Sequence, residues 1–171
     1  KKNSGNVNID HQFFVSPAHS RYETLKRLID FNPGMYGIIF TRTKADAQDI
    51  SERLSKAGYE IEALHGDLTQ QQRDRVMGRF RSKALQLLIA TDVAARGLDI
   101  PEMKHVVHYH MPLKLHEFIH RNGRTARMKS EGTAYIILTE DEKQPNYVDE
   151  NIQELTLSSR NPLPNPPIFA T

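Results

Sequence analysis

Residues 35–65 read MYGIIFTRTKADAQDISERLSKAGYEIEALH, and in this stretch two apolar runs flank a segment with a different period. Residues 35–41 and 59–65 are short and mostly apolar, as buried strands are. Between them, residues 44–57 carry apolar side chains three or four positions apart, the spacing of one helix face: Ala47, Ile50 and Leu54. Gly58 follows as a helix terminator. The stretch therefore predicts a strand, a helix and a second strand, which is the unit that joins parallel strands.

The same alternation continues on both sides of this stretch. Before it, VNIDHQFFV (residues 7–15) predicts an edge strand, and the helix that follows ends at the Asn-Pro-Gly of residues 32–34. After it, Thr69 and Gln72 form a capping box that opens a helix. Further strands are predicted at 84–92, 105–111 and 133–139, with a short helix over 113–122. The pattern predicts the α/β class: a three-layer α/β/α sandwich with a mainly parallel central sheet.

Four polar segments follow predicted strands or a predicted helix. Ligands of parallel sheets collect at the carboxyl ends of the strands. We therefore expect these segments to share one edge of the sheet: TRTK (41–44), HGDLTQ (65–70), TDVAARGLD (91–99) and HRNGRTAR (120–127).

Composition excludes several classes of protein. The chain has 171 residues, enough for one domain with its own core, and it has no cysteine, which excludes disulfides and thiolate metal sites. It lacks an apolar run of about 18 residues, so we expect no membrane contact. We also expect a cytoplasmic location and a monomeric isolated domain. The net charge of +2 is small, but residues 104–129 hold six Lys or Arg and one acid, Glu117. Such a block suits a phosphate chain, although a solvated basic face has the same composition.

The two ends differ in composition from the centre. KKNSGN (residues 1–6) is polar and predicts a linker, which we interpret as a sign that the domain belongs to a longer chain. Residues 158–171 contain a proline-rich run and predict an extended tail. The expected domain therefore spans residues 7–157, with a final helix after Glu140.

HEFIH (residues 116–120) has the His-Glu-x-x-His form of zinc metalloproteases. On a helix His116 and His120 are one turn apart and could share a metal, with Glu117 as the base. A third ligand is harder to find, because Ala126 occupies the position of the usual third histidine and Glu140 follows a predicted strand. The zinc protease stays a weaker alternative. His105, His108 and His110 are interpreted as polar side chains near a strand end.

HRNGRTAR (residues 120–127) carries Arg121, Arg124 and Arg127 at intervals of three. An arginine is always charged, and its planar fork of donors suits phosphate. A solvated basic helix end would have the same spacing. The other polar segments decide between these readings.

Four motifs occur together and in a fixed order, and in them the chain resembles the C-terminal half of a DEAD-box RNA helicase, the second of two RecA-like domains. The resemblance covers about residues 7–157, and Ala126 and MKSEG (128–132) are small departures from the usual pattern. The motifs are IIFTRTK (38–44), HGDLTQQQR (65–73), ATDVAARGLDIP (90–101) and HRNGRTAR (120–127).

The resemblance implies a role for particular residues in nucleotide chemistry. Arg124 and Arg127 are expected to be arginine fingers that reach the γ-phosphate of ATP on the partner domain. Asp99 is expected to bind the ribose, and Gly97 to permit close backbone approach. Asp99 could instead cap a turn.

The resemblance also implies coupling and RNA contacts. His120 and Arg121 are expected to couple the ATP site to the acidic motif of the other half. Contacts with RNA phosphates and sugars are expected from four residues: Thr43, Gln70, Arg73 and Thr91. Thr43 could simply cap a helix, as could Thr69, and Arg73 could be a solvated helix arginine.

The chain lacks the Gly-x-x-x-x-Gly-Lys phosphate loop and the Asp-Glu-Ala-Asp motif. We therefore expect half an active site: ATP and Mg²⁺ held mainly by an N-terminal RecA-like domain of the same polypeptide, and no ATP hydrolysis by this chain alone. RNA is the expected partner. A stand-alone RNA-binding module and a DNA substrate stay open as alternatives.

Overall fold

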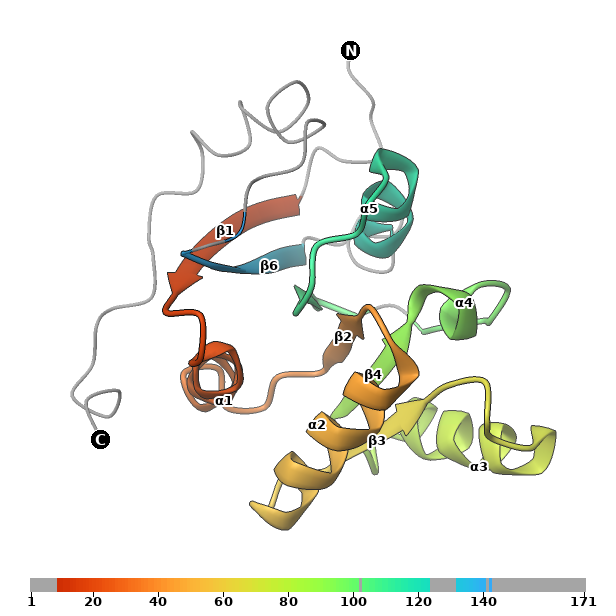
Figure 1. The fold of residues 1–171 in the computed structure, drawn as a ribbon. Helices are drawn as coiled ribbons and strands as arrows, with labels where there is room; N and C mark the ends of the chain where they lie inside the picture. The colour runs from red at the N-terminus through yellow and green to blue at the C-terminus, as the bar shows by residue number, and fades with distance from the viewer. Residues whose placement is uncertain (1–8, 102, 124–131, 141, 143–171) are drawn as a thin grey trace.

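The structure, a computed structural model, describes residues 9–101, 103–123, 132–140 and 142. Within these residues six parallel strands form one sheet in the order β1-β6-β5-β2-β4-β3 (Figure 1). The order places the two strands of the opening stretch near the centre and at one edge of the sheet, with the first and last strands towards the other edge. The strands are β1 (Ile9–Ser16), β2 (Gly37–Thr41), β3 (Ile61–Leu64), β4 (Leu87–Thr91), β5 (His105–His108) and β6 (Gly132–Thr139).

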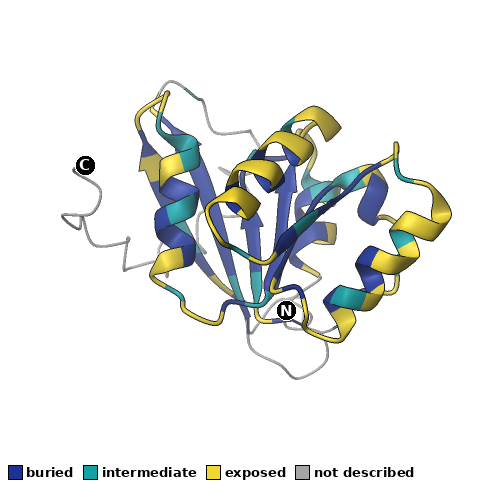
Figure 2. Ribbon diagram, turned by 90° about the horizontal axis from the view of Figure 1, so that it is seen from below, coloured by how far each residue is buried: buried dark blue, intermediate teal, exposed yellow. Residues whose placement is uncertain are grey.

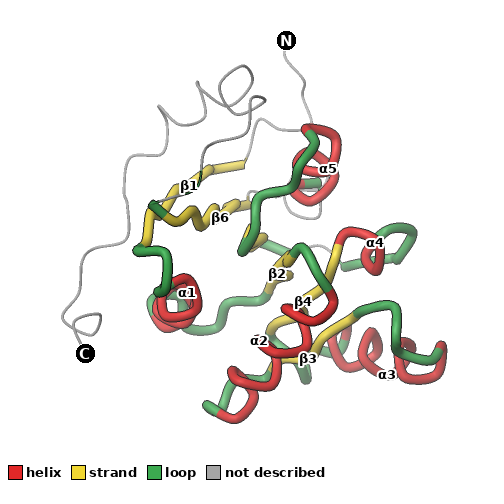
Figure 3. The backbone as a smooth tube through the Cα atoms, viewed as in Figure 1, coloured by secondary structure: helices red, strands yellow, loops and turns green. Residues whose placement is uncertain are grey.

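Five helices cover the two faces of the sheet. α1 and α2 pack on one face, and α3, α4 and α5 lie on the other (Figure 3). This arrangement gives the three layers that the sequence predicts, so the expected α/β/α sandwich is confirmed. The helices are α1 (Arg21–Asp30), α2 (Lys44–Lys56), α3 (Gln70–Arg81), α4 (Asp92–Ala95) and α5 (Leu115–Asn122).

Both faces of the sheet are apolar, because each is covered by helices. Alternate residues of the central strand β2 point to opposite sides: Ile39 packs with α1 and α2, while Ile38 and Phe40 pack with α3 and α4. Figure 2 shows the buried strands between helices whose outer surfaces are exposed. Burial on both faces explains why the strands read as continuous apolar runs in the sequence.

Local signals in the sequence set the helix ends. Thr69 accepts a hydrogen bond from the backbone N–H of Gln72, whose side chain accepts one from the backbone N–H of Thr69, so the capping box is confirmed. Gly58 follows α2 with φ +101°, a conformation that favours glycine. The predicted inward residues of α2, Ala47, Ile50 and Leu54, are buried.

One element differs from the expected pattern. The strand predicted at 84–92 ends at Thr91, and residues 92–95 form the short helix α4, which the sequence pattern does not predict; the Thr91 hydroxyl accepts a hydrogen bond from the backbone N–H of Ala94 at 3.3 Å. A single turn is too short to produce a periodic apolar pattern. The predicted linker (1–6), final helix and proline-rich tail (158–171) lie outside the described residues, so the domain limits stay a prediction.

Candidate functional site

The carboxyl edge of the sheet brings together segments that are far apart in the sequence. Strands β2, β4 and β3 are neighbours and end at Thr41, Thr91 and Leu64. The polar segments 41–44, 65–70 and 91–99 therefore begin side by side, as the rule for parallel sheets predicts. The fourth segment starts at the end of α5, and its described part ends at Gly123.

A buried ion pair joins the fourth segment to the third. Arg121 on α5 donates two hydrogen bonds to the carboxylate of Asp92 on α4, Nε to Oδ1 at 2.7 Å and Nη2 to Oδ2 at 2.8 Å. The Arg121 side chain is 1% exposed and the Asp92 side chain 16%. This bidentate geometry is the strongest form of an arginine–carboxylate contact. It locks α5 to the start of the segment that carries Gly97 and Asp99.

The rest of the Arg121 guanidinium is also occupied within the domain. Its Nη1 donates to the backbone oxygen of His110 at 2.6 Å and lies 3.3 Å from Nδ1 of His108. Its carbon atom lies 5.1 Å from the centre of the Phe40 ring. Arg121 therefore links α4, α5 and the end of β5.

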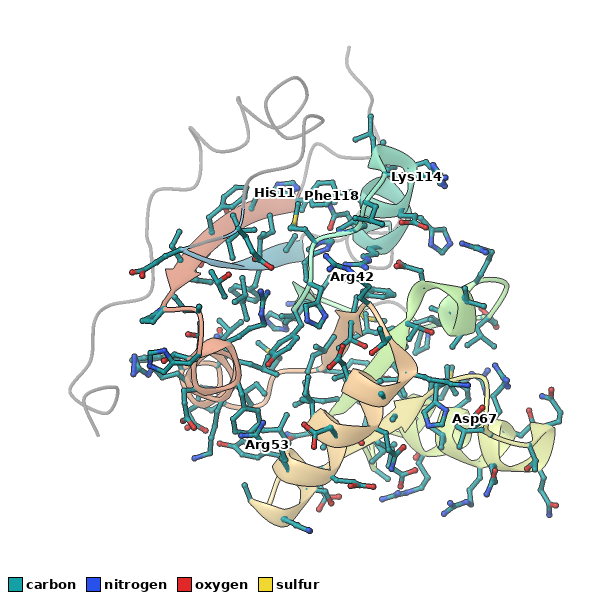
Figure 4. The ribbon with its side chains drawn as sticks, viewed as in Figure 1. His11, Arg42, Arg53, Asp67, Lys114 and Phe118 are labelled. Carbon is teal, nitrogen blue, oxygen red and sulfur yellow. The ribbon has the colours of Figure 1, made fainter. Side chains whose placement is uncertain are left out.

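His110 lies just beyond β5 and receives a hydrogen bond at Nδ1 from the backbone N–H of Arg42, at 3.1 Å. Burial lowers the pKa of His110 to about 4, and the nearby Arg21 and Arg42 also favour the neutral form. A neutral imidazole can accept that bond, whereas an imidazolium cannot. His110 therefore fixes the loop after β2, with Arg42 also donating to the backbone oxygen of Met111 at 3.1 Å (Figure 4).

Two of the four predicted RNA contacts are helix caps. The Thr43 hydroxyl accepts from the backbone N–H of Asp46 at 3.1 Å and lies 2.7 Å from its carboxylate. Thr91 caps α4 as described above. The capping interpretation left open for Thr43 is confirmed, and the same structural role applies to Thr91. An exposed Thr43 still presents its hydroxyl at the carboxyl edge.

The other two predicted RNA contacts lie on the first turn of α3. The Gln70 amide donates to the Asp74 carboxylate at 2.8 Å. Arg73 has a buried Nε for which the described residues provide no hydrogen-bond partner. The Nε atom itself is enclosed, but Arg73 as a residue is half-exposed, so its side chain is accessible to an external acceptor.

An exposed ion pair connects the loops after β2 and β3. Lys44 at the start of α2 lies 3.0 Å from the carboxylate of Asp67 (Figure 4). The hydrogen bond and charge of Lys44 lower the pKa of the Asp67 carboxyl. The pair links an acidic group of the segment 65–70 to a basic group of the segment 41–44.

Gly97 and Asp99 lie in the loop that follows α4. Gly97 has φ +80°, and a Cβ there would meet no atom within 4 Å, so the backbone is accessible. Asp99 is exposed, and its backbone oxygen lies 3.4 Å from Nη2 of Arg81. The expected open backbone at Gly97 is present, and the Asp99 carboxylate faces solvent.

His120 is exposed on α5, one residue before the buried Arg121. Arg124 and Arg127 fall within residues 124–131, outside the described part of the chain. The predicted pair of arginine fingers therefore stays a prediction.

The zinc alternative finds no support in the described residues. His116 and His120 are both exposed on α5, and the described part of the chain contains no group of three or more His, Asp or Glu side chains that could hold a metal ion. Within the same residues no helix has the length and apolar character needed to cross a membrane.

Sequence reasoning missed three members of the site. Asp92 is the partner of Arg121, while His108 and Asn122 lie beside it in the interior. Asp92 and Asn122 stand inside the quoted motifs and His108 lies on the predicted strand 105–111, but only tertiary packing shows what they contact. Asp92 directly follows a strand, which is the one signal that could have marked it.

Comparison with known proteins agrees with this arrangement. Residues 20–129 match the family described as helicase conserved C-terminal domain. The DEAD-box ATP-dependent RNA helicase RhpA of Helicobacter pylori (strain B128) is 40% identical over 137 residues, which make up 80% of this chain and 28% of RhpA. The chain thus spans less than a third of the length of this relative.

Solved structures share the fold. The C-terminal domain of the DEAD-box protein Dbp5 is 32% identical with a TM-score of 0.71, and the match covers 81% of this chain and 80% of that domain. Domain 2 of the DEAD-box helicase Mss116p, solved bound to an RNA duplex, is 31% identical with a TM-score of 0.66, covering 77% of this chain and 55% of that one.

Proposed function

The chain belongs to the helicase conserved C-terminal domain family, in its DEAD-box branch, and from this we propose that it is the second RecA-like half of an ATP-dependent RNA helicase. The first half is an N-terminal RecA-like domain of the same polypeptide. ATP and RNA both bind between the two halves, so each ligand favours the closed arrangement and promotes binding of the other.

The observation that carries this proposal is the buried Arg121–Asp92 ion pair. It joins the segment with the ribose-binding candidate Asp99 to the helix that leads into Arg124 and Arg127. The proposed function needs the motifs 90–101 and 120–127 next to each other, and the buried bidentate contact holds them there.

In the proposed reaction a water molecule attacks the γ-phosphate of ATP held by the N-terminal half. Arg124 and Arg127 donate to the phosphate oxygens as negative charge develops, and fingers of this kind contribute about a thousandfold to a hundred-thousandfold in rate. Asp99 accepts hydrogen bonds from the ribose, which the exposed carboxylate and the accessible Gly97 backbone support. His120, exposed on α5, contacts the acidic motif of the other half.

Mg²⁺ would neutralise phosphate charge in the proposed site, and we assign it to the N-terminal half. Two of the described carboxylates near the site are engaged within this chain, Asp92 by Arg121 and Asp67 by Lys44, while the exposed Asp99 is assigned to the ribose. In this proposal the chain therefore contributes arginines to the phosphates and the Asp99 carboxylate to the ribose hydroxyls.

RNA binds along the carboxyl edge, through its phosphates and sugars, at Thr43, Gln70, Arg73 and Thr91. The half-exposed Arg73 and the exposed Thr43 support this surface. Contacts of this kind tolerate any sequence and weaken with salt, and contacts to the 2′-hydroxyl distinguish RNA from DNA. When the two halves close, they hold one RNA strand in a bent conformation. A bent strand cannot remain part of a continuous duplex, so base pairs separate locally.

The test compares this chain alone with the chain joined to its N-terminal half. Binding of a fluorescent single-stranded RNA is measured by anisotropy at several salt concentrations, with a DNA of matched sequence as competitor. We expect RNA to be preferred, Arg73→Ala to weaken binding and reduce the salt dependence by about one counterion, and exposed Lys56→Ala to change neither. ATP hydrolysis is expected only from the joined protein. Equal binding of RNA and DNA would favour a DNA-directed relative, and hydrolysis by the chain alone would contradict the proposal.

A further inference from the structure

A chain of buried hydrogen bonds runs from Arg121 across the interior to β1. Nη1 of Arg121 lies 3.3 Å from Nδ1 of His108, and Nε2 of His108 lies 2.6 Å from Oδ1 of Asn122. Nδ2 of Asn122 lies 3.4 Å from Nε2 of His11. The four side chains come from α5, β5 and β1, and none is more than 4% exposed.

The chemistry of the four groups allows these bonds to run in one direction only. Oδ1 of Asn122 can only accept, so Nε2 of His108 carries the proton. Nδ1 of a neutral His108 is then free to accept from Arg121, which can only donate. The amide nitrogen of Asn122 donates to Nε2 of His11, so the proton of a neutral His11 lies on Nδ1. Each member donates to the next, in the order Arg121, His108, Asn122, His11.

The surroundings keep both histidines neutral. Burial lowers the pKa of His11 to about 4 and the pKa of His108 well below its ordinary value, with Arg121 acting in the same direction on His108. The charged groups that face this chain are Arg121 and, beyond it, Asp92, while Asp10 lies next to His11 along β1. The ring of Phe118 stacks on both histidines, with centroid distances of 4.8 Å to His108 and 6.1 Å to His11 (Figure 4).

We propose that Asn122 is a positioning residue whose amide completes this one-way chain and so holds the end of α5 against β5 and β1. The proposal rests on the proposed function, because its consequence is the placement of the arginines that follow. Asn122 directly precedes Gly123 and is two residues from Arg124. α5 has eight residues, and Asn122 adds a contact with β5 and β1 at its C-terminal end to the Arg121–Asp92 pair and the packing of Phe118. A displacement of about 1 Å in a group that acts on a reacting centre costs up to about a hundredfold in rate.

Asn122 is suited to this place because it both accepts and donates. Aspartate accepts only, so Asn122→Asp would satisfy Nε2 of His108 and leave His11 without a donor. His11 would then move its proton to Nε2 and donate to the carboxylate. An apolar residue would leave both ring nitrogens unsatisfied.

The first test reads the tautomers directly, by ¹⁵N NMR of the histidine rings in the chain itself at neutral pH. We expect the Nε2–H form for His108 and the Nδ1–H form for His11 in the wild type, and the Nε2–H form for His11 in Asn122→Asp. His105→Asn is the control, because His105 lies on β5 but stacks on Tyr135 at 5.9 Å on the other face of the sheet. It should leave both tautomers unchanged. An Nε2–H form of His11 in the wild type overturns the proposal without the need for any variant.

The second test measures RNA-dependent ATP hydrolysis by the chain joined to its N-terminal half. Asn122→Asp is expected to lower kcat about tenfold or more while KM for ATP changes less, and His105→Asn to leave both unchanged. If the joined wild type hydrolyses ATP normally and Asn122→Asp does too, the positioning role is wrong and the proposed function stands. If the joined wild type shows no RNA-dependent hydrolysis, the proposed function fails and the positioning role fails with it, even where the tautomers are as expected.

Discussion

Replacing Arg121 by alanine should destabilise the domain by about 3–5 kcal/mol, because it removes one partner of a buried ion pair. Arg121 makes two bonds to Asp92, at 2.7 and 2.8 Å, and a third to the backbone oxygen of His110 at 2.6 Å. After the substitution the carboxylate of Asp92, only 16% exposed, has lost both bonds, and His110 has lost a donor. Arg121→Lys should destabilise the domain less than Arg121→Ala, because lysine keeps the positive charge. Some loss of stability should remain, because one ammonium group cannot reach all three acceptors.

The assay is equilibrium unfolding of the chain in urea, followed by far-UV circular dichroism because the chain has no tryptophan. With a slope of about 2 kcal/mol per molar, the expected loss moves the midpoint down by roughly 1.5–2.5 M without a change in slope. Arg96→Ala is the matched control: Arg96 is an exposed arginine next to α4, and its loss should change the stability by less than about 0.5 kcal/mol.

If Arg121→Ala loses less than about 1 kcal/mol of stability, the pair does not behave as a buried ion pair, since that is the range of solvent-exposed ion pairs. It would mean that Arg121 and Asp92 are hydrated in solution. The pair would then give no support to the proposal that the motifs 90–101 and 120–127 are held next to each other.

Three further predictions follow from particular contacts. The pKa of His11 is about 4 in the folded chain and 6.5 when unfolded, so between these values the unfolded chain binds a proton that the folded chain does not. The free energy of unfolding should therefore be about 3 kcal/mol lower at pH 4 than at pH 7 because of this residue, as measured by urea unfolding at both pH values. If His11→Gln keeps the pH dependence of the wild type, this prediction is wrong. Thr69→Ala removes the capping box of α3 and should cost about 1 kcal/mol in the same assay, and no loss would mean that the cap does not hold in solution. Gly97→Ala forces a side chain into φ +80° and should cost about 1 kcal/mol, whereas a gain in stability would show that the loop adopts another conformation.

The order of helices and strands could be predicted from the sequence because their signals are local. The period of the apolar residues gives α2 and β2 directly, and Thr69 and Gly58 mark helix ends through their own backbone requirements. The rule for the carboxyl ends of parallel strands then brings the polar segments to one edge. The one-turn helix α4 was missed because a single turn has no period to detect.

The contacts that organise the site could not be predicted in the same way. Arg121 was expected to couple the ATP site to the acidic motif of the other half, and the structure adds a contact that the sequence did not reveal: Asp92, 29 residues earlier in the chain, accepts two of its hydrogen bonds. His108 was interpreted as a polar residue near a strand end, yet it lies in the interior, where Asn122 and Arg121 satisfy its ring nitrogens. The link from Asn122 to His11 spans 111 positions, and only the folded chain shows it.

The proposal that this chain completes an ATP site on another domain depends most on Arg127. The measurement is RNA-dependent phosphate release from ATP by the chain joined to its native N-terminal half, for the wild type, Arg127→Ala and the control Lys56→Ala. We expect that release needs RNA, that it falls at least about a hundredfold in Arg127→Ala while ATP still binds, and that Lys56→Ala behaves as the wild type. Full activity of Arg127→Ala would mean that this arginine does not act on the ATP, and the basic segment after α5 would then need another role.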